Sequence, residues 1–259
     1  MIVTARNHTS AAVIDAPVSP SLGRTFSSVA DPSLDPHLNG EYLRHNPTWH
    51  VEYGPWKANN IHRLLQQKGL QPKTICEVGC GAGEVLRQLQ LKMDPSCQFW
   101  GCDVAPAAIE LAQQRTNDRL RFDLLDFTAV ETPYSDLLLV LEVVDHVEDY
   151  LGFLRAIKPR AEWKLFSFSL DICMQAALRK GALLRRLEVH SHLHHFNKEL
   201  ALAALHKTGY EVVDAFYPTM FPFSKLAKLA KPLRQLAFRL NPDLTVRALG
   251  GYSLMVLAR

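Results

Sequence analysis

From Lys73 to the C-terminus, short apolar runs alternate with amphipathic helical patterns, and this alternation constrains the fold more than any other feature. The runs are TICEV, QFWGCD, LRFDLL, DLLLVLE, WKLFSFSL, YEVVDAFY and YSLMVLA. Several are apolar at consecutive positions, which is typical of parallel strands covered by helices on both faces. Asn197 and Gly209 have the residue types of a helix cap and a helix stop around KELALAALHKT. The pattern predicts an α/β fold with a seven-stranded, mostly parallel sheet.

The segments outside this alternation differ in character. Residues 1–36 are rich in Ser, Pro, Ala and Asp without periodicity, which predicts a mobile tail. Near the other end, SKLAKLAKPLRQLAFRL predicts a helix that Pro232 should kink or divide. Its leucines at 226, 229, 233, 236 and 240 share one face, opposite most of the basic residues. Burial of this face in the core is the favoured interpretation, ahead of a substrate cap or a membrane-surface helix.

Charge and cysteine content narrow the class of protein. The net charge is only +3, but residues 1–154 carry 12 basic and 19 acidic residues, whereas residues 155–247 carry 16 basic and 7 acidic ones. The second part could therefore face something acidic, although a solvated basic surface is commoner. An odd number of cysteines without a matching metal-binding pair favours buried free thiols. With no apolar run of 18 residues and no secretory signal, we expect a cytoplasmic protein.

The stretch ICEVGCGAG at residues 75–83 predicts a strand followed by a glycine-rich turn and a helix, an arrangement that brings main-chain N–H groups close to a ligand. A phosphate-binding P-loop would need Gly-Lys-Ser/Thr, but Gly83 is followed by Glu84. A dinucleotide site prefers G-x-G-x-x-G, and here the spacing is one residue short. Glu77, two residues before the first glycine, disfavours a pyrophosphate and suits a cationic ligand.

The pattern E-x-G-x-G-x-G resembles the glycine-rich motif of class I S-adenosylmethionine-dependent methyltransferases. The resemblance continues through WGCDVAPAAIELAQQR, LRFDLLDF and SDLLLVLEVVDHVEDYLGFLRAIKP, and covers about residues 57–258. It implies a three-layer Rossmann-like sheet with an antiparallel last strand. It also implies one methyltransferase domain at 37–259, made of a lid and helix at 37–72, a cofactor-binding core at 73–170, and acceptor-side insertions with C-terminal helices at 171–250.

The resemblance assigns roles at the cofactor site. Glu77 would help hold the methionine amino group, Asp103 the ribose hydroxyls and Asp126 the adenine amino group. The full implied set is Glu77, Gly79, Cys80, Gly81, Gly83, Asp103, Val104, Asp126, Phe127, Leu141 and Glu142. Three alternatives stay open: Asp103 could cap the helix before Pro106, Asp126 could be a solvated turn acid, and Glu142 could be an exposed acid at a helix start.

The acceptor side is expected in RRLEVHSHLHHFNKEL, because family members often carry a histidine after the fifth strand. The H-x-H-x-H spacing would place His190, His192 and His194 on one side of an extended segment. His192 and His194 are the favoured acid/base or substrate-contact residues, with His146 of the acid-His-Val step a further candidate. His195 contacts the substrate or has a structural role. No carboxylate lies close enough along the chain to complete an obvious metal site, so no metal is expected.

Four aromatic or imidazole side chains precede the first core helix. Trp49, His50, Tyr53 and Trp56 form either a lid over the methyl donor or ordinary packing. A lid would exclude water from the site and help to align donor and acceptor, which is the main task of the protein in a direct displacement.

The resemblance implies transfer of a methyl group from S-adenosylmethionine to a small-molecule or short-peptide acceptor, with release of S-adenosylhomocysteine. Oxygen, as a hydroxyl or a carboxylate, is the favoured acceptor atom; nitrogen and carbon are alternatives, and so is a non-catalytic subunit that binds the cofactor. Nucleic acid is not favoured, because no N/D-P-P-Y/F target-base motif is present.

Overall fold

The computed structural model of the chain describes residues 35–218 and 225–259. The predicted mobile tail at 1–36 therefore lies outside the described residues, apart from its last two positions. Of these, Asp35 is buried and accepts hydrogen bonds from the main-chain N–H and the ring of His37.

The sheet has seven strands in the order β3-β2-β1-β4-β5-β7-β6. The strands are β1 (Thr74–Val78), β2 (Gln98–Asp103), β3 (Leu120–Leu124), β4 (Ser135–Leu141), β5 (Ala161–Ser169), β6 (Val212–Phe216) and β7 (Ser253–Ala258). The pairs among β1 to β5 are parallel, and β7 runs antiparallel to both β5 and β6. The prediction of a mostly parallel sheet with an antiparallel last strand is confirmed.

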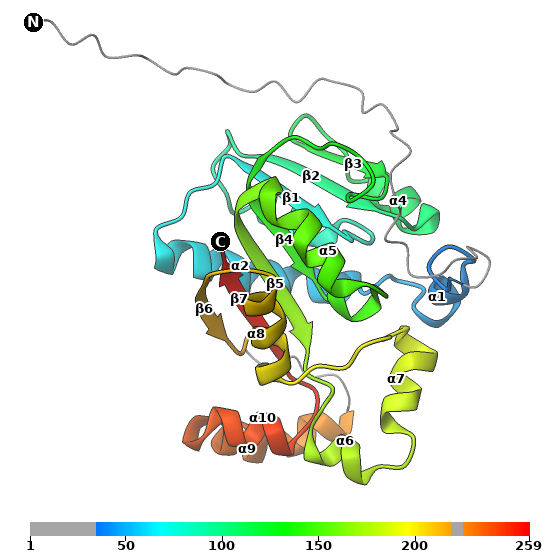
Figure 1. Ribbon diagram of the computed structural model, residues 1–259, viewed down its shortest axis with the longest axis vertical. Helices are drawn as coiled ribbons and strands as arrows, with labels where there is room; N and C mark the ends of the chain where they lie inside the picture. Colours follow the sequence, from blue (N-terminus) through cyan, green and yellow to red (C-terminus); the bar gives the residue numbers. More distant parts are fainter. Residues whose placement is uncertain (1–34, 219–224) are drawn as a thin grey trace, which may run out of the picture.

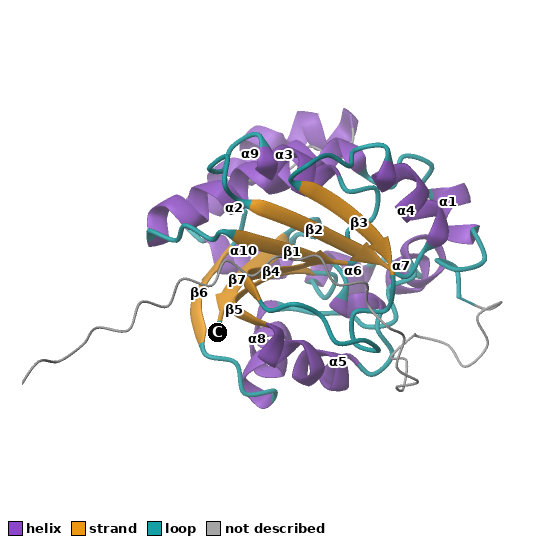
Figure 2. Ribbon diagram, turned by 90° about the horizontal axis from the view of Figure 1, so that it is seen from above, coloured by secondary structure: helices purple, strands orange, loops and turns teal. Residues whose placement is uncertain are grey.

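Helices cover both faces of the sheet (Figures 1 and 2). The longer helices are α2 (Gly54–Lys68), α3 (Glu84–Gln90), α4 (Pro106–Gln113), α5 (Tyr150–Ile157), α7 (Ala182–His190), α8 (Lys198–Lys207), α9 (Lys225–Leu240) and α10 (Pro242–Ala248). Shorter ones are α1 (Glu41–His45), α6 (Met174–Leu178), and the 3-10 turns η2 (Val51–Tyr53), η3 (Val144–His146) and η4 (Lys158–Arg160). The Asn197 side chain accepts from the Leu200 N–H, as expected for a helix cap.

The consecutive apolar residues of the strands are explained by two cores, one on each face of the sheet. In β4, Leu137 and Leu139 belong to the core under α2, α3 and α4, whereas Leu138 and Val140 belong to the core under α5 and α8. Because successive strand residues point to opposite faces, a strand covered on both sides must be apolar at every position. Among the described residues, no helix combines the length and apolarity that crossing a bilayer requires.

Helix α9 narrows one expectation and corrects another. Pro232 does not divide the segment, because α9 runs as one helix from Lys225 to Leu240 with the proline inside it; proline removes one main-chain hydrogen bond, yet its φ is compatible with a helix. Burial of the leucine face is wrong for the leucines whose side chains are described: Leu233, Leu236 and Leu240 are 72%, 55% and 78% exposed. Phe238 provides packing instead, stacked on Tyr252 with ring centres 5.6 Å apart.

The architecture positions a binding site at one edge of the sheet. The strand order reverses between β1 and β4, and in open α/β sheets ligands bind at such a switch point, beyond the carboxyl ends of the strands. In Figure 1, α6, α7, α9 and α10 gather beyond this edge.

Candidate functional site

A single cavity of about 730 Å³ opens at this edge. Its walls come from the turn after β1, the ends of β2, β4 and β5, the segment from His37 to Lys57, helices α6 and α7, and the approach to β7. Segments far apart in the sequence therefore share one space of the size typical for small-molecule sites.

The glycine turn forms one wall of the cavity. Gly79, Gly81 and Gly83 all have positive φ, the region in which residues with a Cβ are strained. The Gly79 and Cys80 N–H groups donate to the Cys102 carbonyl, which ties the turn to β2. A Cβ at Gly81 would lie 2.8 Å from the Trp49 ring, so glycine is required for the close approach of that side chain.

Glu77 lies at the base of this turn and lines the cavity. Its side chain is almost fully buried, and its Oε2 has no hydrogen-bond partner within the described part of the chain. Burial raises the pKa of Glu77 to about 8, and the nearby Lys57 only partly opposes this shift. A buried carboxylate oxygen without a partner is costly, and a cationic group in the cavity would satisfy it.

Asp103 ends β2 and also lines the cavity. Its carboxylate accepts from the Gly81 N–H at 2.8 Å and from the Ala105 N–H at 2.9 Å, so it fixes the glycine turn and the start of α4 together. Burial raises the pKa of Asp103, although these hydrogen bonds oppose the shift. The open alternative of a helix cap is wrong, because Ala105 is the cap residue of α4 and the helix has no side-chain cap hydrogen bond. Each carboxylate oxygen has a further lone pair for a ligand hydroxyl.

The other residues assigned to the cofactor divide into two groups. Cys80, Val104 and Leu141 line the cavity, and burial raises the pKa of the Cys80 thiol far above its usual value. Gly83, Asp126 and Phe127 do not line it. Phe127 packs in the core against Trp100, and Asp126 Oδ1 accepts from the Thr128 side chain and main chain. The adenine role of Asp126 stays a prediction.

Glu142 follows β4 with a φ of 60°, which is rare for a residue with a side chain. Its carboxylate forms an ion pair with Lys57 of α2 at 2.7 Å. Burial would raise the pKa of Glu142, but Lys57 outweighs it and the pKa is lowered. The open alternative of an exposed helix-start acid is wrong, since Glu142 is only partly exposed, lines the cavity and is held by a cation.

An aromatic group covers part of the cavity. Trp49, His50 and Tyr53 line it together with Tyr42, and Tyr42 packs against Trp49 with ring centres 5.1 Å apart. Trp49 and His50 both have positive φ, a conformation that places Trp49 over Gly81. Trp56 does not line the cavity.

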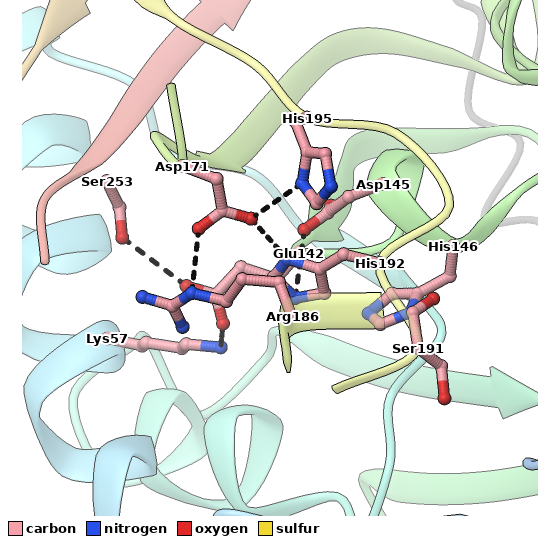
Figure 3. Close-up of polar contacts among 10 residues, drawn as sticks. All are labelled: Lys57, Glu142, Asp145, His146, Asp171, Arg186, Ser191, His192, His195 and Ser253. Atoms are coloured by element: carbon pink, nitrogen blue, oxygen red, sulfur yellow. Dashed lines mark hydrogen bonds and ion pairs between the residues drawn. The ribbon is translucent and has the colours of Figure 1, made fainter. Parts of the chain in front are cut away.

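At the opposite end, His192 is held between two carboxylates (Figure 3). Its Nδ1 lies 2.6 Å from Asp171 Oδ2 and its Nε2 lies 3.4 Å from Asp145 Oδ2. Burial would lower the pKa of His192, but Asp171 and Asp145 outweigh it and raise the pKa. Asp171 is fixed from its other side by Arg186 at 3.2 Å.

Two further histidines line the cavity beside His192. His146 Nδ1 lies 3.0 Å from the Ser191 carbonyl, and its ring is 5.1 Å from that of His192. Burial and the neighbouring histidines lower the pKa of His146 well below its usual value. Burial likewise lowers the pKa of His190 to about 4, helped by Arg186.

The remaining histidines lie elsewhere, which corrects the expected arrangement. His190 ends α7, and Ser191 with a φ of 59° turns the chain, so H-x-H-x-H is not one extended segment. His194 does not line the cavity; its Nε2 contacts the Glu148 carbonyl and its ring packs on Tyr150. His195 also lies outside the lining and contacts Asp171 at 3.3 Å.

Several lining or supporting residues were missed by sequence reasoning: Tyr42, Lys57, Asp145, Asp171, Arg179, Arg186 and Arg234. The signal available for Asp171 was its place directly after the fifth strand run, and for Asp145 its place beside His146. The three arginines come from α7, α9 and the end of α6, and nothing in their local sequence distinguishes them from solvated basic residues.

Comparison with known proteins agrees with this architecture. Residues 76–161 match a family described as a methyltransferase domain. The chain is 33% identical over 121 residues to a tRNA N(3)-methylcytidine methyltransferase of Drosophila melanogaster, covering 44% of this chain and 34% of that protein. It is 28% identical over 85 residues to a malonyl-[acyl-carrier protein] O-methyltransferase of Anoxybacillus flavithermus, covering 33% of this chain and 32% of that protein. The chain thus spans about a third of the length of these curated relatives.

The fold itself has solved counterparts. The magnesium protoporphyrin IX methyltransferase of Synechocystis PCC 6803, solved with bound S-adenosylmethionine, superposes with a TM-score of 0.57 at 14% identity. The superposition covers 89% of this chain and 97% of that one, so the likeness extends over the whole fold. Residues 76–161 thus match a methyltransferase domain, and the strand order and the superposition show that the chain has the Rossmann-like methyltransferase fold.

Proposed function

We propose that this chain transfers a methyl group from S-adenosylmethionine to an oxygen of a small-molecule or short-peptide acceptor, releasing S-adenosylhomocysteine. One observation carries the proposal: a single cavity connects the glycine turn, Glu77 and Asp103 at one end with the Asp171-held His192 at the other. We call these the donor end and the acceptor end.

The donor end fits S-adenosylmethionine on two grounds. The unpartnered Glu77 Oε2 would accept from the cationic methionine amino group, and the side-chain-free glycine turn allows the cofactor to approach the main chain. When bound, the cofactor supplies a methyl group activated by a sulfonium centre. Asp103 would hold the ribose hydroxyls, and Tyr42, Trp49, His50 and Tyr53 would exclude water from the reacting atoms.

The acceptor end suits an oxygen that must lose a proton. A carboxylate accepts but does not donate, so the hydrogen bond from His192 Nδ1 to Asp171 places the Nδ1 proton there. Nε2 is then the nitrogen able to take a proton from an acceptor hydroxyl as the new C–O bond forms. A carboxylate acceptor would need no base, and His192 would then contact and orient it.

Three arginines favour an acceptor that carries an acidic group. Arg179, Arg186 and Arg234 line the cavity near the acceptor end, and the Arg234 Nε is buried without a partner in the described part of the chain. Arginine recognises carboxylates and phosphates through its planar fork of donors. Three of the 16 basic residues at 155–247 therefore lie in the cavity wall.

The relatives support methyl transfer and leave more than one acceptor atom open. One relative is named as an O-methyltransferase and the other as a methyltransferase of a tRNA cytidine nitrogen. Transfer to nitrogen, including on RNA, is therefore the second candidate, and a carbon acceptor or a non-catalytic cofactor-binding subunit follows. The five free cysteines, all buried, suit a reducing compartment such as the cytoplasm.

Two experiments test the proposal. Calorimetric titration with S-adenosylmethionine should show one binding site, and the absence of both heat and a thermal shift would exclude it. The protein is then incubated with isotope-labelled donor and extracts of its native host, and products are identified by mass. A labelled oxygen of a small acidic product is expected; labelled RNA would support the second candidate, and cofactor binding with no labelled product would support the non-catalytic one.

A further inference from the structure

Three side chains at the acceptor end each place one possible metal-ligand atom close to the other two. The proposed base catalysis by His192 does not require this grouping. Asp145 and His146 belong to η3, and His192 follows α7. One nitrogen or oxygen from each lies within 4.8 Å of the others. Figure 3 shows Asp145 and His146 next to the His192 ring.

The hydrogen bonds made by the Nδ1 atoms of His146 and His192 determine which nitrogen of each ring carries the proton. The Ser191 carbonyl can only accept, so His146 Nδ1 carries the proton of its 3.0 Å hydrogen bond. Asp171 fixes His192 in the same tautomer at 2.6 Å. Both Nε2 atoms therefore offer lone pairs. Metal-binding histidines are oriented in this way, with the second nitrogen donating to a carbonyl or a carboxylate.

The third group is the buried carboxylate of Asp145. Asp145 is 1% exposed, and neither of its oxygens has a hydrogen-bond partner among the described residues. Its Oδ2 faces the His192 Nε2 lone pair at 3.4 Å, so two electron-rich atoms oppose each other. A proton between them would satisfy this pair and leave His146 Nε2 unused, whereas a metal ion would satisfy all three groups.

The separation between Asp145 and His192 fits two ligands of one metal ion. Ligand atoms about 2.1 Å from a tetrahedral ion lie about 3.4 Å from one another, which matches the 3.4 Å between Asp145 Oδ2 and His192 Nε2. The neighbouring combination of Asp171, His192 and His195 fits less well. There the 2.6 Å contact between Asp171 and His192 is a hydrogen bond, too short for two ligands of one ion.

We propose that Asp145, His146 and His192 bind one divalent transition-metal ion, such as Zn²⁺. Two imidazoles and one carboxylate suit such ions. His146 and His192 line the cavity, so the open coordination positions would face the acceptor. An ion there would occupy His192 Nε2, so the imidazole would no longer accept the proton of an acceptor hydroxyl. The cation would instead lower the pKa of that hydroxyl, and the proton would leave to solvent. Only this role in catalysis rests on the proposed function; metal binding does not.

The test uses the tag-free full chain, treated with chelator and then freed of it, with no donor or acceptor present. We expect one Zn²⁺ per chain by calorimetry. We expect one Co²⁺ per chain by visible absorption, with the bands of a four- or five-coordinate ion. D145N and H192Q should lose at least as much affinity as D171N, which replaces the carboxylate orienting His192 by a weaker amide acceptor and should cost about 10- to 100-fold. H194Q is the matched control and should bind like the wild type.

Three results would overturn the proposal: no stoichiometric binding, a thiolate charge-transfer band that places Co²⁺ on a cysteine, or loss of binding in H195Q but not in D145N. Circular dichroism and thermal melting confirm the fold of each variant, and H192Q and D171N decide the test if D145N does not fold. Wild-type binding of S-adenosylmethionine, measured separately, keeps failure of the metal site distinct from failure of the proposed function.

Discussion

The donor end and the acceptor end of the cavity are built differently. The donor end is made from one continuous stretch, from Glu77 to Asp103, and relies on main-chain N–H groups, glycines and two acids. The acceptor end combines side chains from η3, the segment after β5, α7 and α9. Main-chain geometry can be shared across a family because it tolerates few substitutions, whereas a wall of side chains can change residue by residue to suit another acceptor. The four predictions below test this division.

The largest expected effect belongs to the acceptor end. His192→Ala should lower kcat by about 10²- to 10⁴-fold, the usual contribution of a positioned acid or base, and leave the Kd for S-adenosylmethionine unchanged. Steady-state kinetics and calorimetry measure the two quantities. His194→Ala serves as control, since His194 lies outside the cavity. A parallel loss of cofactor affinity in His192→Ala would contradict the division.

Asp103→Ala should act on the donor end alone. It removes the acceptor of two main-chain hydrogen bonds together with the proposed ribose contact, at a cost of about 1.5–3 kcal/mol, or roughly 10- to 150-fold in the Kd for S-adenosylmethionine. Calorimetry of Asp126→Ala alongside tests the adenine prediction. If His192→Ala weakened cofactor binding as much as Asp103→Ala does, the two ends would have been wrongly assigned.

Glu77→Gln should separate stability from binding. Burial raises the pKa of Glu77 from 4.5 to about 8, so between these pH values the folded chain holds a proton that the unfolded chain has lost. The free energy of unfolding therefore falls as the pH rises through this interval. Without ligand, the variant should be more stable than the wild type at pH 8, by about 1–3 kcal/mol, and similar at pH 4.

Denaturant unfolding at the two pH values measures this difference, and calorimetry should show weaker S-adenosylmethionine binding by the same variant. Equal stability of the two proteins at pH 8 would show that the buried carboxylate is compensated in the unliganded chain.

The smallest effect is expected on the outer wall of the acceptor end. Leu236→Ser should change the free energy of unfolding by less than about 0.5 kcal/mol, as is usual for exposed positions, because Leu236 is 55% exposed. The matched change Phe238→Ser should cost more, since Phe238 stacks on Tyr252. Thermal melting compares the two, and a large loss in Leu236→Ser would mean that a partner covers this face.

The fold could be predicted from sequence because its signals are local. Each of the seven strands appears in the sequence as a short apolar run. A strand that is covered on both faces needs apolar residues at nearly every position, so it stands out from polar segments. The antiparallel placement of β7 came from family resemblance, since nothing in YSLMVLA itself encodes direction. Of the two outcomes expected at Pro232, division of the helix is wrong, because the neighbouring turns of a helix can tolerate the loss of one main-chain hydrogen bond.

The candidate site could be predicted in part. Glu77, Gly79, Gly81 and Asp103 follow predicted strands closely and line the cavity, whereas Gly83 does not. The acceptor end could not be predicted in this way. H-x-H-x-H suggested three equivalent histidines, but the end of α7 and the turn at Ser191 place His192 in the cavity and His194 outside it.

The sequence by itself determined the layered α/β fold, the glycine turn and a preference for a ligand with positive charge, because these depend on residues that are neighbours along the chain. Only the tertiary structure decided which charged groups meet. It paired Lys57 with Glu142 and brought Asp145 within 3.4 Å of His192, 47 positions later in the sequence. Such contacts depend on how strands and helices pack across the sheet. The residues next to each partner in the sequence do not indicate which distant side chain it will contact.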